Sequence, residues 1–175
     1  MVKLSDYATV SEEATLYDAV LALEKAQAKY DQGRYLHRAI LVYDQNNKIV
    51  GKLSHLDILM ALEPKYEKLG IVKSFPRFGL SYQFQKAMHE QLRFWNKPMN
   101  EICKKANQIK VKQFMYTPGE GEHVEEKASL DEAINQLIMG HHQSLLVTRD
   151  KEIVGILRLT DVFTEIVETI KACKL

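Results

Sequence analysis

Two aspartates, Asp57 and Asp161, lie in two nearly identical turns of the chain. Each follows a glycine between apolar residues, in KIVGKLSHLDIL (48–59) and EIVGILRLTDVF (152–163), at a spacing of 104 residues. A carboxylate at the start of a helix can accept two hydrogen bonds from a ribose diol. The free N–H groups and partial positive charge of the same helix end suit a phosphate. The pattern is therefore consistent with a nucleotide site that occurs twice.

We name these segments the first Asp turn (residues 51–57) and the second Asp turn (residues 155–161). Three residues before each aspartate stands a side chain that could reach a phosphate, Ser54 in the first turn and Arg158 in the second. A glycine between apolar residues at the end of a strand lets a backbone or a ligand approach closely.

A purely structural interpretation uses the same residues. Ser54 can cap a helix and Asp57 can answer from its first turn, which makes a capping box. Arg158 has no side-chain acceptor and cannot cap in this way. Thr160 could be the cap of the second turn instead, which leaves Asp161 as a favourable charge near the helix start. The residues alone leave both interpretations open.

The elements around the two turns repeat as well. VSEEATLYDAV (10–20) resembles VEEKASLDEAI (124–134) at a spacing of 114, so the first copy holds ten extra residues, most of them within 25–38. Apolar residues three and four apart predict an amphipathic helix that begins after Thr15 or Ser129. Two apolar runs around a polar turn then predict a hairpin, and a second helix closes each copy. We expect an α+β fold in which the two units share a core.

A different segment separates the copies. The repeat divides the chain into a first domain at 1–63, an inter-repeat linker at 64–110 and a second domain at 111–175. Within the linker, apolar residues at helical spacing between Leu80 and Trp95 predict an inserted helix. Its apolar stripe caps the core in one interpretation. In the other it forms a dimer contact, because methionine and aromatic side chains are enriched at interfaces.

The doubled pattern resembles a tandem pair of CBS domains, also called a Bateman module. The matching text is TVSEEATLYDAV and RAILVYDQNNKIVGKLSHLDIL in one copy, and VKQFMYTPGEGEHVEEKASLDEAI and SLLVTRDKEIVGILRLTDVF in the other. The resemblance implies a β-α-β-β-α core in each domain. It also implies that the two domains pack through their sheets with pseudo-twofold symmetry and leave two clefts between them.

In that family the clefts often hold adenosine-containing ligands. Carried over by resemblance, Asp57 and Asp161 would bind the ribose, and Ser54 and Arg158 would lie near the phosphate. Arg158 departs from the family's Ser or Thr, and Lys52 departs from its usual apolar residue. The first strand of each copy and the first hairpin strand would line the base slot, with Thr9, Val10, Ile40, Leu41, Tyr116, Thr117, His123, Val124, Leu145 and Leu146. Plain core packing is the favoured explanation for each Val, Ile or Leu among these residues.

The resemblance implies a regulatory, energy-sensing module. It would bind AMP, ADP, ATP or S-adenosylmethionine as a regulatory ligand, require no cofactor, and signal by a conformational change to an unidentified regulated protein. Such modules commonly form homodimers. The alternative is a protein-interaction or scaffold module with empty or vestigial nucleotide sites, which the departures at Arg158 and Lys52 and the aromatic linker helix favour.

Composition narrows the class of protein further. The 24 Lys and Arg residues nearly balance the 23 Asp and Glu residues, so a net charge of +1 gives no electrostatic reason to expect nucleic acid or a membrane as partner. Cys103 and Cys173 form no disulfide or zinc pattern. No apolar run approaches the ~20 residues that span a bilayer, and the first residues do not resemble a signal peptide. We expect a cytoplasmic protein that is not an enzyme, because no activated nucleophile, acid–base pair or metal cluster is visible.

Overall fold

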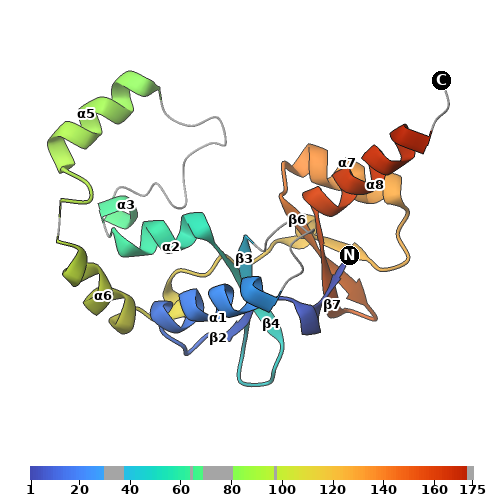
Figure 1. Cartoon of the computed structure of the whole chain (residues 1–175), viewed down its shortest axis with the longest axis horizontal. Helices are drawn as coiled ribbons and strands as arrows, with labels where there is room; N and C mark the ends of the chain where they lie inside the picture. The colour runs from blue at the N-terminus through green and yellow to red at the C-terminus, as the bar shows by residue number, and fades with distance from the viewer. Residues whose placement is uncertain (30–37, 64, 69–80, 97, 173–175) are drawn as a thin grey trace.

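The computed structural model describes residues 1–29, 38–63, 65–68, 81–96 and 98–172 (Figure 1). Most of the ten-residue extension of the first copy lies outside these ranges. Two units repeat the order strand, helix, strand, strand, helix, as predicted. The first contains β2 (Thr9–Ser11), α1 (Leu16–Lys29), β3 (Ala39–Tyr43), β4 (Ile49–Ser54) and α2 (His55–Leu62). The second contains β5 (His123–Glu125), α7 (Leu130–Gly140), β6 (Ser144–Arg149), β7 (Glu152–Arg158) and α8 (Leu159–Ala172).

The predicted capping residues start the first helix of each unit. The Thr15 hydroxyl accepts a hydrogen bond from the Asp18 N–H at 3.1 Å, and the Asp18 carboxylate accepts one from the Thr15 N–H at 2.9 Å. In α7, Ser129 Oγ accepts a hydrogen bond from the Glu132 N–H at 3.4 Å. The local signals in the sequence therefore place both helix starts correctly.

Each unit has a hairpin with a parallel strand beside it. Strand β2 is parallel to β3 and β3 is antiparallel to β4, and β5, β6 and β7 repeat this pairing. Helices cover one face of each sheet and bury a core there. The first core is built on Ala8, Val10, Leu16, Ala19, Leu23, Ile40, Val42, Leu53, Ile58, Ala61 and Val111. The second is built on Val124, Ala133, Leu137, Leu145, Val147 and Val162.

The leading segment of each unit pairs with the sheet of the other unit. Strand β1 (Val2–Lys3) runs antiparallel to β7 with Val2 opposite Ile156, which gives the second sheet the order β1-β7-β6-β5. In the same way, Tyr116 and Lys52 of β4 exchange two backbone hydrogen bonds, of 2.8 and 2.9 Å. Val2 and Tyr116 are equivalent in the repeat, as are Ile156 and Lys52. The chain therefore crosses between the units twice, in a pseudo-twofold arrangement.

The two motif glycines lie under these crossing segments. A Cβ atom on Gly155 would lie 2.7 Å from the carbonyl oxygen of Val2. A Cβ atom on Gly51 would lie 2.7 Å from Sδ of Met115 and 3.1 Å from the carbonyl oxygen of Tyr116. The two distances of 2.7 Å are too short for unstrained contact, and the one of 3.1 Å is tighter than an ordinary contact. Close approach of a backbone was one of the two roles predicted for these glycines, and it is confirmed.

A third buried cluster joins the two sheets. Leu41 of β3 and Leu146 of β6, which are equivalent in the repeat, are both buried in it. Ile49 and Ile153, another equivalent pair, pack against them and are partly buried. Because the same positions of both units meet here, the sheets pack face to face about the pseudo-twofold axis, as predicted.

The linker contains the predicted inserted helix, α5 (Tyr82–Leu92), but this helix does not cap the core. Figure 1 shows α5 at one edge of the molecule, away from both sheets. Tyr82 is 79% exposed, Phe84 is 50% exposed, and the helix has no buried residue. The core-capping interpretation is therefore wrong for α5, while Leu80 lies outside the described residues. The dimer-contact interpretation stays a prediction.

Another helix takes the place expected for α5. Helix α6 (Met99–Gln108), which the sequence pattern did not predict, packs against α1 and α2. A short helix, α3 (Lys65–Lys68), carries Tyr66, whose ring stacks on the buried Phe94 with centroids 4.6 Å apart. The linker thus adds its own layer beside the first unit.

The predicted domain boundaries, at residues 63/64 and 110/111, stay predictions. Val111, the first residue of the predicted second domain, is fully buried in the core of the first unit.

Across the described ranges, no helix combines the length and apolarity needed to cross a membrane.

Candidate nucleotide site at the two Asp turns

The first Asp turn forms a complete capping box. Strand β4 ends at Ser54 and α2 begins at the next residue. Ser54 Oγ accepts a hydrogen bond from the Asp57 N–H at 3.2 Å, and Asp57 Oδ2 accepts from the N–H and the hydroxyl of Ser54, both at 2.7 Å. The capping interpretation is thereby confirmed here. No described residue donates to the other carboxylate oxygen, Oδ1.

Replacing Ser54 with alanine is expected to lower the free energy of unfolding by about 1 kcal/mol, because the N-terminal N–H groups of α2 lose their cap. Urea denaturation followed by circular dichroism measures this. Ser81→Ala, which removes the equivalent cap of α5 (Ser81 Oγ to the Phe84 N–H, 3.3 Å), is the matched control. It is expected to have a smaller effect, since α5 buries no residue. Equal effects would contradict the prediction.

The second Asp turn is closed by an ion pair. Arg158 Nε donates to both carboxylate oxygens of Asp161 at 3.0 Å, Nη2 also donates to Oδ1, and the Arg158 backbone N–H donates to Oδ2 at 3.2 Å. Charge-assisted, bidentate bonds of this kind are strong. Arg158 is only 8% exposed. Helix α8 begins at Leu159, so Thr160 lies inside the first turn and the suggestion that it is the N-cap is wrong.

The predicted base-slot residues fall into three groups. Val10, Ile40, Val124 and Leu145 are buried in the separate cores, and Leu41 and Leu146 are buried between the sheets. Thr9, Tyr116 and Thr117 are exposed, and His123 is partly buried. The structure therefore packs all six apolar members and brings Leu41 and Leu146 together. Their role in binding stays a prediction.

A cluster of polar and charged side chains around the buried Glu122 lies next to the second copy of the predicted base slot. Lys52 of β4 donates to Glu122, and the Tyr116 hydroxyl donates to the other oxygen of the same carboxylate. The Gly119 N–H adds a bond of 3.3 Å. Glu122 is 4% exposed. Burial raises the pKa of Glu122, but the hydrogen bonds from Lys52 and Tyr116 and the charge of Lys52 outweigh this and hold the pKa below its usual value. The carboxyl is therefore ionised at neutral pH.

Sequence reasoning missed this cluster. Lys52 was recognised as a departure from the family pattern, and TPGEGE (117–122) was visible as an acidic segment. Lys52 and Glu122 are 70 residues apart, and only the crossing of the Tyr116 segment onto β4 brings them together. A polar residue at a position expected to be apolar was the one available signal.

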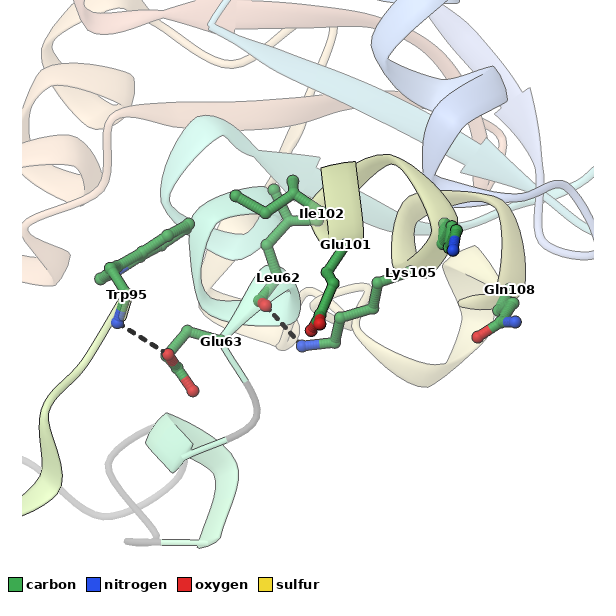
Figure 2. A pocket seen from close by; sticks show the side chains of 8 residues that line it. Leu62, Glu63, Trp95, Glu101, Ile102, Lys105 and Gln108 are labelled. Atoms are coloured by element: carbon green, nitrogen blue, oxygen red, sulfur yellow. Dashed lines mark hydrogen bonds between the residues drawn. The ribbon is translucent and has the colours of Figure 1, made fainter. Parts of the chain in front are cut away.

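A cavity of about 380 Å³ lies between the linker and the first unit (Figure 2). Trp95 and Glu63 form one side of it, and the Glu63 carboxylate accepts the Trp95 backbone N–H at 2.9 Å. Burial raises the pKa of Glu63, but backbone N–H groups of Trp95 and Lys65 lower it below its usual value. Lys105 donates to the Leu62 carbonyl oxygen across the cavity. None of the predicted site residues lines this cavity.

A second cavity, of about 610 Å³, is lined by His123 and Val124 together with residues of α7. Its lining does not include Asp161. Within the described ranges, no three His, Cys, Asp or Glu side chains come together as metal ligands would.

The family model described as CBS domain matches residues 2–64 and 112–168. The two matched stretches contain both Asp turns, and together they cover most of the chain. The chain therefore belongs to the CBS domain family and carries two CBS domains in tandem.

Several solved structures have the same fold. The CBS domain of a CBS domain containing membrane protein from Sphaerobacter thermophilus is 16% identical, with a TM-score of 0.60, over 94% of this chain and 87% of that chain. CBSX2 from Arabidopsis thaliana is 19% identical, with a TM-score of 0.60, over 99% of this chain and 94% of that chain. A structure of CBSX2 in complex with AMP is 17% identical, with a TM-score of 0.57, over 97% of this chain and 94% of that chain. No curated protein matches the chain in sequence.

Proposed function

We propose that this CBS pair is a regulatory module that binds an adenosine-containing nucleotide between its two domains. The observation that carries the proposal is the geometry of the first Asp turn. Asp57 stands in the first turn of α2 with one carboxylate oxygen, Oδ1, that accepts no hydrogen bond from any described residue. That oxygen can accept a ribose hydroxyl, while the N-terminus of α2 favours a phosphate.

The fold offers a route from binding to signalling. The segments that lead into β2 and β5 each pair with the opposite sheet, so a ligand at an Asp turn lies beside the junction between the units. A ligand that binds one relative arrangement of the domains more tightly shifts the population toward it. The size of that shift is limited by the difference in affinity between the two arrangements. We also propose that the module forms a homodimer and that it passes its signal to a separate regulated protein.

The solved relatives support the ligand class without establishing it. One of the structures that shares this fold is described as CBSX2 in complex with AMP. Its likeness to this chain concerns the fold. The step from that fold to a nucleotide in this chain rests on Asp57.

Thermal unfolding of the full chain with AMP, ADP, ATP or S-adenosylmethionine tests the proposal. A ligand at ~100 times its dissociation constant stabilises the folded state by about 2.7 kcal/mol. In a chain of this size that raises Tm by roughly 5–11 °C. The shift is expected to disappear in Asp57→Asn. It is expected to persist in Asp131→Asn, which changes an exposed acid in the first turn of α7.

Failure of all four ligands to raise Tm would contradict the proposal and favour the second candidate. That candidate is a protein-interaction module. The Arg158–Asp161 ion pair and the exposed aromatic side chains of α5 support it.

A further inference from the structure

We propose that only the first Asp turn binds nucleotide, so that each chain binds one molecule, because the protein's own side chains occupy the second position. This inference rests on the proposed function and selects between its two repeated positions. It follows from a comparison of equivalent residues, which the internal repeat makes possible within one chain.

The two carboxylates that were predicted to bind ribose have different surroundings. Among the described residues, only Ser54 donates hydrogen bonds to the Asp57 carboxylate, and both of them go to Oδ2. Both oxygens of Asp161 are covered by the guanidinium of Arg158, and one of them also accepts the Arg158 backbone N–H. A ribose diol at Asp161 would have to displace a nearly buried arginine from its bidentate partner. No described side chain has to move to free Asp57 Oδ1.

The predicted base slots differ as well. In the second copy, Glu122 immediately precedes β5 and binds Lys52 and Tyr116. In the first copy, the equivalent positions hold Ala8, Ile156 and Val2, and all three are buried and apolar. The methyl group of Ala8 therefore takes the position that the Glu122 carboxylate, bound to Lys52 and Tyr116, has in the second copy.

The Lys52–Glu122 pair and the Arg158–Asp161 pair lie at the same end of the second sheet. His123, next to Glu122, is opposite Leu146, and Ser144 of the same strand, β6, is opposite Arg158. A nucleotide bound to Asp161, with its base beside residues 116–123, would disturb both the Arg158–Asp161 pair and the Lys52–Glu122 pair. Removing one partner of a buried ion pair leaves the other without compensation, which is strongly unfavourable. The first position imposes no such cost.

Isothermal titration calorimetry of the full chain with AMP, and with ATP in a second series, tests the inference. The wild type is expected to bind one molecule per chain. Asp57→Asn is expected to abolish binding, and Asp161→Asn is expected to bind one molecule with an affinity within twofold of the wild type. Circular dichroism of each variant confirms that it is folded.

The repeat also supplies a gain-of-function variant. Arg158→Ser combined with Lys52→Ile and Glu122→Ala gives the second position three residues of the first and removes the charged side chains that occupy it, while Tyr116 is kept. This triple variant is expected to bind two molecules per chain, and Asp161→Asn is expected to remove the second one. A triple variant that still binds one molecule would overturn the role assigned to these side chains.

Two further results separate the inference from the proposed function. Two molecules bound per wild-type chain, or one molecule lost in Asp161→Asn and retained in Asp57→Asn, would overturn the one-site inference and leave nucleotide binding intact. Absence of binding by AMP and ATP, together with unchanged Tm for all four adenosine ligands, would overturn both.

Discussion

Replacing Lys52 with methionine is expected to lower the free energy of unfolding by about 3 kcal/mol. The reason lies with its partner, because Glu122 stays buried and charged after its counter-ion is removed. The Tyr116 hydroxyl and the Gly119 N–H still donate to that carboxylate, but neither carries a charge. Urea denaturation at neutral pH, followed by circular dichroism, measures the loss.

The matched control is the double variant Lys52→Ile with Glu122→Ala. It removes both charges and installs the apolar residues, Ile156 and Ala8, that the repeat places at the equivalent positions. Replacing a buried ion pair with well-packed apolar residues is often neutral or stabilising. We therefore expect the double variant to be close to the wild type in stability. A Lys52→Met variant as stable as the double variant would show that Glu122 is not stranded by the loss of lysine.

Replacing Gly155 with alanine is expected to lower the free energy of unfolding by about 2 kcal/mol, as overpacking of a tight contact does. The new Cβ would meet the Val2 carbonyl oxygen at 2.7 Å, and that atom belongs to the backbone of β1. Relief requires β1 to move away from β7, which weakens the pairing of Val2 with Ile156. The lower entropy of the unfolded alanine chain offsets only part of this loss.

Gly51→Ala is the matched variant in the first unit. Its Cβ would meet Sδ of Met115 at 2.7 Å, a side-chain atom that can rotate away, and the backbone only at 3.1 Å. We therefore expect Gly51→Ala to destabilise the protein less than Gly155→Ala in the same urea titration. The reverse order would contradict the assignment of β1 as the rigid neighbour.

The parts of the fold that follow from local sequence were predictable. Thr15 and Ser129 mark helix starts because capping depends on residues three positions apart. The doubled Gly and Asp pattern and the apolar runs around it indicated the repeat and the order of the elements in each unit. The pairing of the units through their sheets was implied by the resemblance to CBS domains. The capping box of Ser54 and Asp57 belongs to the same local class.

The parts that depend on contacts distant in sequence were not predictable. The Lys52–Glu122 pair requires the crossing of one unit's leading segment onto the other unit's sheet. Helix α5 has a good amphipathic pattern, yet it is α6 that packs beside α1 and α2, and α5 has no buried residue. Helical periodicity reports an apolar face, and it does not report what that face meets.

The second Asp turn shows how one substitution changes a repeated motif. The sequence shows Arg158 at the position that Ser54 has in the first turn. It leaves open whether this arginine helps to bind a phosphate or closes the site. In the structure the guanidinium turns back to Asp161, three residues later, where the bidentate geometry is satisfied within the turn. Ser54 is too short to cover its aspartate in this way, so Asp57 keeps an oxygen for a ligand.

The most direct test of nucleotide binding at the first Asp turn is a two-dimensional amide NMR spectrum of the isotopically labelled protein with increasing AMP. The account predicts that the largest shifts fall on the amides of residues 54–58 and 9–10, because these surround Asp57 and the first strand of its unit. The amides of residues 159–161 are expected to shift little. Unchanged amide signals at residues 54–58 with saturating AMP, and then with ADP, ATP and S-adenosylmethionine, would contradict the account.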